Sequence, residues 1–210
     1  MSTECLFERW FSLSTKWPIR RDLRTSETHP LQIDWITSNL FAGRIGITLC
    51  PGKYQPISWS GGWNRDLEID IGAIEDSGAT LVVSLVEEAE MRDLRVQGLG
   101  NAILARDIEW IHIPFEDTTA PDYKWMKDFD LVAPSILTSI KNGDSVVIHC
   151  KGGLSRAGTV AALLLCSMGM DVIAALELIR EVRSKDCIDY IQQAFLISVT
   201  SHWEFKYKYD

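Results

Sequence analysis

A cysteine and an arginine lie six residues apart in the segment HCKGGLSRAGT, residues 149–159. The backbone N–H groups of a tight loop, together with the N-terminus of a following helix, form a binding site for an anion. A cysteine at the rim of such a site is held as its thiolate, and an arginine fork matches two phosphate oxygens. Cys150 and Arg156 therefore suit phosphoryl transfer through a phosphocysteine intermediate. The residues between them would form the phosphate cradle: Lys151, Gly152, Gly153, Leu154 and Ser155.

Two other interpretations of this loop stay open on the residues alone. Cys150 could be an inert cysteine buried at a strand–turn–helix corner, with Arg156 on the surface. It could also serve sulfur transfer or arsenate reduction, which use a reactive cysteine in a similar loop. A phosphatase, unlike these, needs a carboxylic acid that protonates the leaving oxygen, so the carboxylates elsewhere in the chain distinguish the interpretations.

A second segment, residues 110–122, supplies three such carboxylates directly after an alternating apolar stretch. If that stretch is a strand parallel to the one before Cys150, both loops emerge at the same edge of a sheet. The residues alone do not choose among Glu116, Asp117 and Asp122. Asp122 follows Pro121 and precedes a helical pattern, so it also suits a helix N-cap.

Strands alternate with helices along the chain, which predicts an α/β fold with a mainly parallel central sheet flanked by helices. The predicted strands are Leu40–Thr48, Leu81–Val86, Trp110–Phe115 and Ser145–His149. Helices are expected from Leu67 to the stop at Gly78, over Glu87–Gln97, around Trp125–Ile140, and at about 155–169, 171–184 and 188–203. Ligands of such sheets bind beyond the carboxyl ends of the strands, which again indicates the Cys150 loop.

The chain has 210 residues, which fits one medium domain. We predict an N-terminal extension over residues 1–35 and one catalytic domain over residues 36–210. The formal charge of −8 argues against nucleic acid or an anionic membrane surface as the main partner. The longest nearly apolar run, Gly158–Met170, has 13 residues and is too short to span a bilayer. Five unclustered cysteines indicate no metal site and a reduced, cytoplasmic protein.

The segment HCKGGLSRAGT resembles the signature loop of the protein tyrosine phosphatase superfamily, His-Cys-x-x-Gly-x-x-Arg. The Gly-Gly pair and the upstream pattern Trp-x-His-x-Pro-x-x-Asp are similar to the kinase-associated phosphatase branch of the dual-specificity enzymes and its bacterial relatives. The resemblance runs from about Leu40 to the C-terminus. It implies a cysteine-phosphatase fold, Cys150 as nucleophile, Arg156 as phosphate ligand and, among the three carboxylates, Asp117 as the acid.

The resemblance also assigns supporting roles. His149 matches the residue that orders the loop and tunes the thiol, and Gln193 falls where relatives carry a glutamine that positions water. Many members place Ser or Thr directly after the arginine, where the hydroxyl assists the thiolate leaving group. Here Ala157 stands at that position, and the hydroxyl of Ser155 or Thr159 would have to substitute.

We therefore expect a phosphatase without metal or cofactor that acts on phosphotyrosine and on phosphoserine or phosphothreonine in a phosphorylated protein. A phosphoinositide or RNA-end phosphatase on the same scaffold is an alternative. Lys151 also occurs in lipid-directed members of the superfamily, but the second lysine that those usually carry in the loop is absent, and Leu154 occupies that region. A catalytically weak phosphate-binding module is a further alternative.

Overall fold

The structure, a computed structural model, describes residues 23–58 and 61–202. Its main sheet has five strands in the order β1-β2-β7-β5-β6. All neighbouring strands are parallel except β1, which runs antiparallel to β2 at the edge. This sheet confirms the predicted fold class. The strands are β1 Asp34–Ile36, β2 Arg44–Thr48, β5 Ala79–Ser84, β6 Glu109–His112 and β7 Ser145–His149.

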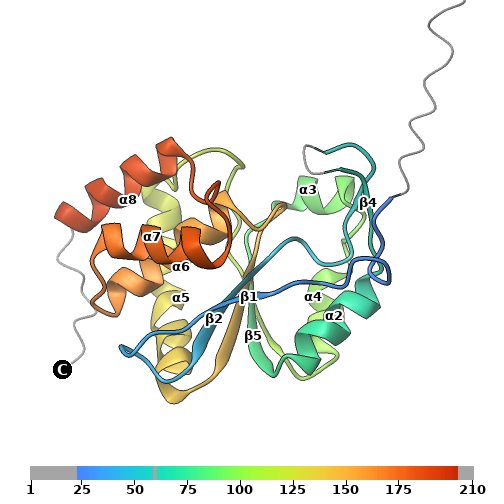
Figure 1. Ribbon diagram of the computed structural model, residues 1–210, viewed down its shortest axis with the longest axis horizontal. Helices are drawn as coiled ribbons and strands as arrows, with labels where there is room; N and C mark the ends of the chain where they lie inside the picture. Colours follow the sequence, from blue (N-terminus) through green and yellow to red (C-terminus); the bar gives the residue numbers. More distant parts are fainter. Residues whose placement is uncertain (1–22, 59–60, 203–210) are drawn as a thin grey trace, which may run out of the picture.

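Helices cover both faces of this sheet (Figure 1). The smaller layer consists of α2 Leu67–Asp76, α3 Glu88–Asp93 and α4 Leu99–Leu104. The larger layer consists of α5 Tyr123–Asn142, α6 Ser155–Ser167, α7 Val172–Val182 and α8 Tyr190–His202. Two apolar clusters fill the space between the sheet and these layers.

β7 and α6 form the centre of the molecule. Every residue of β7 is buried, because this strand lies between two others and is covered on both faces. In α6 all residues from Arg156 to Ser167 are buried, so the apolar run that the sequence contains is a core helix. None of the helices in the described ranges is long and apolar enough to cross a membrane.

A small second sheet lies beside the carboxyl edge of the main one. It pairs β3, Tyr54–Gln55, with β4, Trp63–Asn64, and Arg24 bridges to Trp63 alongside it. A buried ion pair anchors the segment to α2, where the Asp70 carboxylate accepts hydrogen bonds from Arg65 at 2.7 and 2.8 Å.

Several element boundaries differ from the prediction for local reasons. The helix predicted over Glu87–Gln97 ends at Asp93, because Arg95 adopts a left-handed φ of 61° and the chain closes with a Val96 N–H to Met91 O bond. α4 was not predicted, and it follows directly in the same layer. The strand predicted over Trp110–Phe115 ends before Pro114, which has no N–H for the ladder.

The strand predicted from Leu40 begins only at Arg44. Just before it, the Gly43 N–H donates to Ile140 O near the end of α5. β1 lies across the predicted boundary between the extension and the catalytic domain, and it joins the sheet. The division at residue 35 stays a prediction, and residues 1–22 of the extension lie outside the described ranges.

Candidate active site

Cys150 lies directly after β7, at the carboxyl edge of the parallel strands, where the topology predicts a ligand site. The residue is 3% exposed and lines a pocket of about 1030 Å³. After a four-residue loop, α6 begins at Ser155 with no side chain capping its N-terminus. The uncapped first turn leaves N–H groups and a partial positive charge available to an anion.

Two carbonyl groups of the loop Lys151–Leu154 accept hydrogen bonds from basic side chains. Lys53 Nζ donates to Lys151 O at 3.0 Å, and Arg183 Nε donates to Gly153 O at 2.9 Å. The amide N–H groups of the loop donate to no other group in the described part of the chain. A buried N–H group without an acceptor raises the free energy of the folded state unless a ligand accepts its hydrogen bond. The loop is therefore a preorganised binding site for an anion.

Gly153 has a steric reason to be glycine. Its φ is +66°, and a Cβ at this position would lie 2.3 Å from the carbonyl oxygen of Thr48 at the end of β2. A Cβ at Gly152 would meet nothing within 4 Å, so the loop geometry does not require that glycine. Only one glycine of the pair therefore makes the close approach that shapes the cradle.

Arg156 is fully buried in the first turn of α6 and joins three loops of the site. Its two terminal nitrogens hold the Glu90 carboxylate in a fork, with Nη1–Oε2 at 2.6 Å and Nη2–Oε1 at 2.8 Å. Nη1 also donates to Leu85 O after β5 and to Phe115 O after β6, at 3.2 and 3.0 Å. The guanidinium group is thus fixed from both sides while its Nε–H has no hydrogen-bond acceptor among the described residues.

The structure distinguishes the three candidate carboxylates. Asp117 Oδ1 lies 3.2 Å from Arg156 Nε without forming a hydrogen bond, and Asp117 also lines the pocket. Asp122 caps α5 by accepting from Trp125 N at 2.7 Å, the structural role that its position also suggested. Glu116 is exposed and does not line the pocket. Asp117 is therefore the carboxylate that shares the site with Cys150 and Arg156.

Glu90 is a site residue that the sequence did not reveal. Burial acts to raise the pKa of this carboxyl, but hydrogen bonds from Arg156 and from the Glu87 backbone N–H outweigh it and hold the pKa below its ordinary value. The pKa of Arg156 is raised in turn, because the Glu90 contact outweighs its burial. The only sequence signal was a helix-capping pattern, Glu87 with Glu90 three residues on, which says nothing about a partner on α6.

His149 is fully buried behind Cys150. Its Nε2 lies 2.6 Å from Ser84 Oγ, which also accepts from Trp110 Nε1 at 2.8 Å. Burial, reinforced by the nearby Arg156 charge, lowers the pKa of His149 to about 3, so the imidazole is neutral. His149 Nε2 is the only acceptor for the Ser84 hydroxyl in the described ranges, which assigns the histidine proton to Nδ1.

Gln193 does not join the other predicted residues. Its side-chain oxygen accepts from Arg180 at 2.7 Å, on the side of α8 that faces α7, so the position predicted for it is wrong. The neighbouring Gln192 is fully buried and takes the place instead. Its Nε2 donates to Thr119 O in the acid loop, and its Oε1 lies 2.9 Å from Thr159 Oγ1 on α6.

The two hydroxyls that could replace one at Ala157 lie in different surroundings. Ala157 is fully buried in the core, so the residue after Arg156 presents no polar group. Thr159 is buried and hydrogen-bonded to Gln192, which ties it to the acid loop. Ser155 lines the pocket. Of the two, Ser155 is the hydroxyl positioned beside the cradle.

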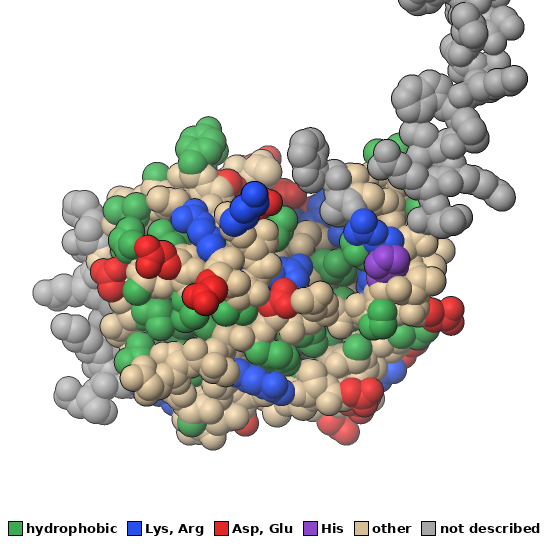
Figure 2. Space-filling model, in the orientation of Figure 1, with side chains coloured by type: hydrophobic (Ala, Val, Ile, Leu, Met, Phe, Trp, Pro, Cys, Tyr) green, Lys and Arg blue, Asp and Glu red, His purple; other side chains and the backbone are tan. Residues whose placement is uncertain are grey.

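The molecular surface over the site is hollowed and carries basic side chains. Figure 2 shows Lys and Arg side chains and a histidine around this hollow. The described part of the chain contains no cluster of His, Cys, Asp or Glu that could hold a metal ion. The pocket brings together the Cys150 thiol, an array of N–H donors and the Asp117 carboxylate.

Comparisons with known proteins identify relatives of this chain. A family model described as dual specificity phosphatase, catalytic domain, matches residues 72–199. Cyclin-dependent kinase inhibitor 3 from Rattus norvegicus is 27% identical over 172 residues, covering 80% of this chain and 77% of that protein. A protein tyrosine phosphatase type IVA 3 from Bos taurus is 30% identical over 127 residues, covering 57% of this chain and 64% of that protein.

Solved structures show the same fold. A crystal structure of kinase associated phosphatase with its catalytic-site cysteine replaced by serine superposes with a TM-score of 0.72. The identity is 22%, and the alignment covers 83% of this chain and 98% of that one. The fold is thus that of the tyrosine phosphatase-like proteins. Since the family model matches more than half of the chain, this chain belongs to the dual-specificity phosphatase family and is a phosphoric monoester hydrolase.

Removal of the Glu90 charge should destabilise the folded protein. We expect Glu90→Gln to lower the free energy of unfolding by about 3 kcal/mol, because it leaves the buried Arg156 cation with only the partly exposed Asp117 carboxylate as a counter-ion. Glu88→Gln, an exposed change on the same helix, should alter it by no more than about 0.5 kcal/mol. Urea unfolding measures both. Equal stability of the two variants would mean that Glu90 does not hold Arg156.

The buried, neutral His149 should make stability depend on pH. Below the ordinary pKa of 6.5 the unfolded chain takes up a proton on this imidazole, whereas the folded protein does so only near pH 3. Stability is therefore lost as pH falls from 6.5, by about 1.4 kcal/mol per pH unit from this group. His149→Asn should remove that contribution from unfolding curves at pH 7, 6 and 5.

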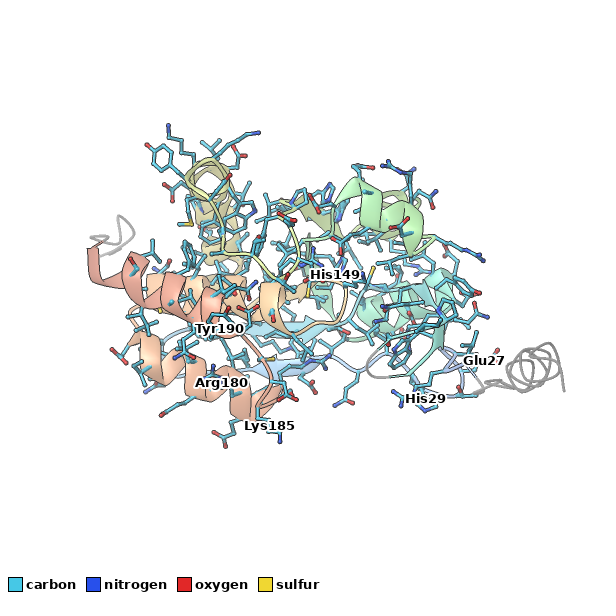
Figure 3. The ribbon with its side chains drawn as sticks, turned by 90° about the horizontal axis from the view of Figure 1, so that it is seen from above. Glu27, His29, His149, Arg180, Lys185 and Tyr190 are labelled. Carbon is cyan, nitrogen blue, oxygen red and sulfur yellow. The ribbon has the colours of Figure 1, made fainter. Side chains whose placement is uncertain are left out.

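His29→Asn is the matched control for this measurement. His29 is exposed and lies at the edge of the molecule, whereas His149 lies inside it (Figure 3). The His29→Asn protein should keep the acid sensitivity of the parent. An identical pH slope in the two variants would contradict the assignment of the slope to His149.

Proposed function

We propose that this protein is a cysteine-dependent protein phosphatase that hydrolyses phosphotyrosine and phosphoserine or phosphothreonine through a phosphocysteine intermediate. One observation carries the proposal. The buried Arg156 Nε–H has no hydrogen-bond acceptor and lies 3.2 Å from the Asp117 carboxylate, and Cys150 lies beside a loop whose amide N–H groups donate to no other group in the described ranges. Donors fixed in this way suit three oxygens of a phosphoryl group and require no reorganisation during the reaction.

In the first step the Cys150 thiolate attacks phosphorus in line with the leaving oxygen. The S–P bond forms as the P–O bond to the substrate breaks. The amides of Lys151–Leu154 and the Arg156 Nε–H hold the three equatorial oxygens, which carry the developing charge. Asp117, as the carboxylic acid, donates its proton to the departing oxygen, so that the product leaves as an alcohol or a phenol.

In the second step a water molecule attacks the phosphocysteine. Asp117, now a carboxylate, accepts the proton of the attacking water, and the P–S bond breaks to release phosphate and the Cys150 thiolate. Ser155 is the hydroxyl positioned to donate to the departing sulfur, since Ala157 cannot. Gln192 fixes the acid loop to α6 through Thr119, which keeps Asp117 over the pocket in both steps.

A protein substrate is supported by charge and by family. The chain carries a formal charge of −8, which disfavours approach to an anionic membrane or to RNA. The family model and relatives named as tyrosine phosphatases support phosphoprotein as the substrate class. Phosphoinositide and RNA-end phosphates belong in the substrate panel as competing outcomes.

The first test is hydrolysis of p-nitrophenyl phosphate by the parent protein and by Cys150→Ser, in EDTA with a thiol reductant. The parent should turn over in chelator, and Cys150→Ser should lose all measurable turnover because the hydroxyl is a far weaker nucleophile than the thiolate. A folded parent without activity on this substrate or on phosphopeptides would instead favour the phosphate-binding module. Preference for phosphoinositides or RNA ends in the panel would replace the proposed substrate class.

The role of Asp117 is tested on an alkyl phosphate, whose leaving group needs protonation. Asp117→Asn should lower the rate by about 10²–10⁴, the usual contribution of general acid catalysis. Glu116→Gln, the exposed neighbour in the same loop, should remain close to the parent. If Asp117→Asn matches Glu116→Gln on the alkyl substrate, Asp117 is not the general acid.

A further inference from the structure

Arg183 follows the last residue of α7 and contacts the cradle loop with its side chain. Its Nε donates to Gly153 O at 2.9 Å, and its Nη2 lies 3.5 Å from Gly152 O. Its Nη1 lies 2.6 Å from Asp34 Oδ2 on β1. One guanidinium group therefore connects the cradle loop to the edge strand of the main sheet.

The ion pair between Arg183 and Asp34 is largely shielded from solvent. The two side chains are 14% and 13% exposed, respectively. The other carboxylate oxygen of Asp34 accepts a hydrogen bond from Gln32 Nε2 at 2.7 Å. Water and salt weaken ion pairs on an open surface, but they screen a largely buried pair much less. Asp34 is therefore a firm anchor for the Arg183 guanidinium group.

The hydrogen bond from Arg183 to Gly153 O orients the N–H group of the next residue. The carbonyl and N–H groups of a planar trans peptide point in opposite directions. The Leu154 N–H is therefore directed away from Arg183, and it donates to no group in the described ranges. Gly152 and Gly153 give this part of the loop more backbone freedom than other residues would. The orientation of the peptide thus depends on a contact from outside the loop.

We propose that Arg183 and Asp34 are positioning residues of the phosphate cradle. Asp34 fixes the guanidinium group of Arg183, and Arg183 fixes the peptide that presents the Leu154 N–H to the bound anion. This inference rests on the proposed function and adds two residues that act on the reaction without contacting the substrate. They reach the site from β1 and from the end of α7, so the cradle is supported by elements outside the strand and helix that flank it.

Direct binding of the anion by Arg183 is the competing role, because this side chain also lines the pocket. The two roles predict opposite effects of the substitution Asp34→Asn. If Arg183 bound the anion itself, loss of its counter-ion would free the guanidinium group and strengthen anion binding. If Arg183 acts through Gly153 O, loss of its anchor loosens the loop and weakens anion binding.

The test measures the binding of tungstate, a tetrahedral oxyanion, to Cys150→Ser with and without Asp34→Asn by titration calorimetry. Asp34→Asn should raise the dissociation constant about tenfold, the effect of one lost charge-assisted hydrogen bond. With Cys150 intact, Asp34→Asn should lower kcat for p-nitrophenyl phosphate more than it raises KM, because the loop amides stabilise charge that develops in the transition state. Unchanged or tighter tungstate binding would overturn the positioning role.

Two further variants, also made in Cys150→Ser, separate geometry from charge. Arg183→Lys keeps the positive charge and an intact Asp34, but it lacks the planar fork that joins Asp34 to Gly153 O, so it should weaken tungstate binding almost as much as Asp34→Asn. Lys185→Gln removes a positive charge from an exposed side chain that does not line the pocket, and it should leave the affinity unchanged. Full affinity in Arg183→Lys, or weakened binding in Lys185→Gln, would assign the effect to charge and overturn the inference.

Tungstate binding also separates this inference from the proposed function, because it requires no turnover. Weaker binding in the Asp34→Asn protein, without hydrolysis of any phosphate ester by the parent, supports the positioning role and overturns the proposed function. Hydrolysis by the parent, together with equal tungstate affinities of Cys150→Ser with and without Asp34→Asn, overturns the positioning role and leaves the proposed function in place.

Discussion

The buried ion pair between Arg156 and Glu90 is the interaction on which the rest of the site depends. A fully buried guanidinium group is tolerated only when a counter-ion and further acceptors surround it. Glu90 supplies the charge, and the carbonyls of Leu85 and Phe115 supply the acceptors. These partners lie after β5 and β6, whereas Arg156 lies after β7, so satisfying one cation brings three loops together at one edge of the sheet.

The same constraint explains why the cradle can accept an anion in an acidic protein. Glu90 uses both terminal nitrogens of Arg156, which leaves only the Nε–H and the loop amides for a ligand. Lys53 and Arg183 donate to carbonyls of the loop, and its N–H groups have no acceptor in the described ranges, so the local field beside Cys150 is positive. In the proposed function, selectivity for an anion therefore rests on oriented donors beside Cys150 and not on net charge.

Residues whose role depends on nearby sequence were predicted well. Ser145–His149 is a short apolar strand bounded by a turn and by the cradle, and it was placed at its observed limits. Roles that depend on which face of a helix packs against the rest of the protein were harder to predict from the sequence. Gln192 and Gln193 are adjacent on α8, about 100° apart around its axis, and only packing against α6 and α7 decides which of them meets the acid loop.

The sequence by itself determined the α/β class, the strand before Cys150, the cradle and its arginine. Each of these follows from a local pattern of residue types. The tertiary structure alone decided that Glu90 holds Arg156 and that Asp117, among three carboxylates, shares the pocket. It also placed Lys53 and Arg24 beside Trp63. These contacts join segments far apart in the chain, and no periodicity or spacing encodes a partner across such separations, because side-chain packing selects it only once the layers have assembled.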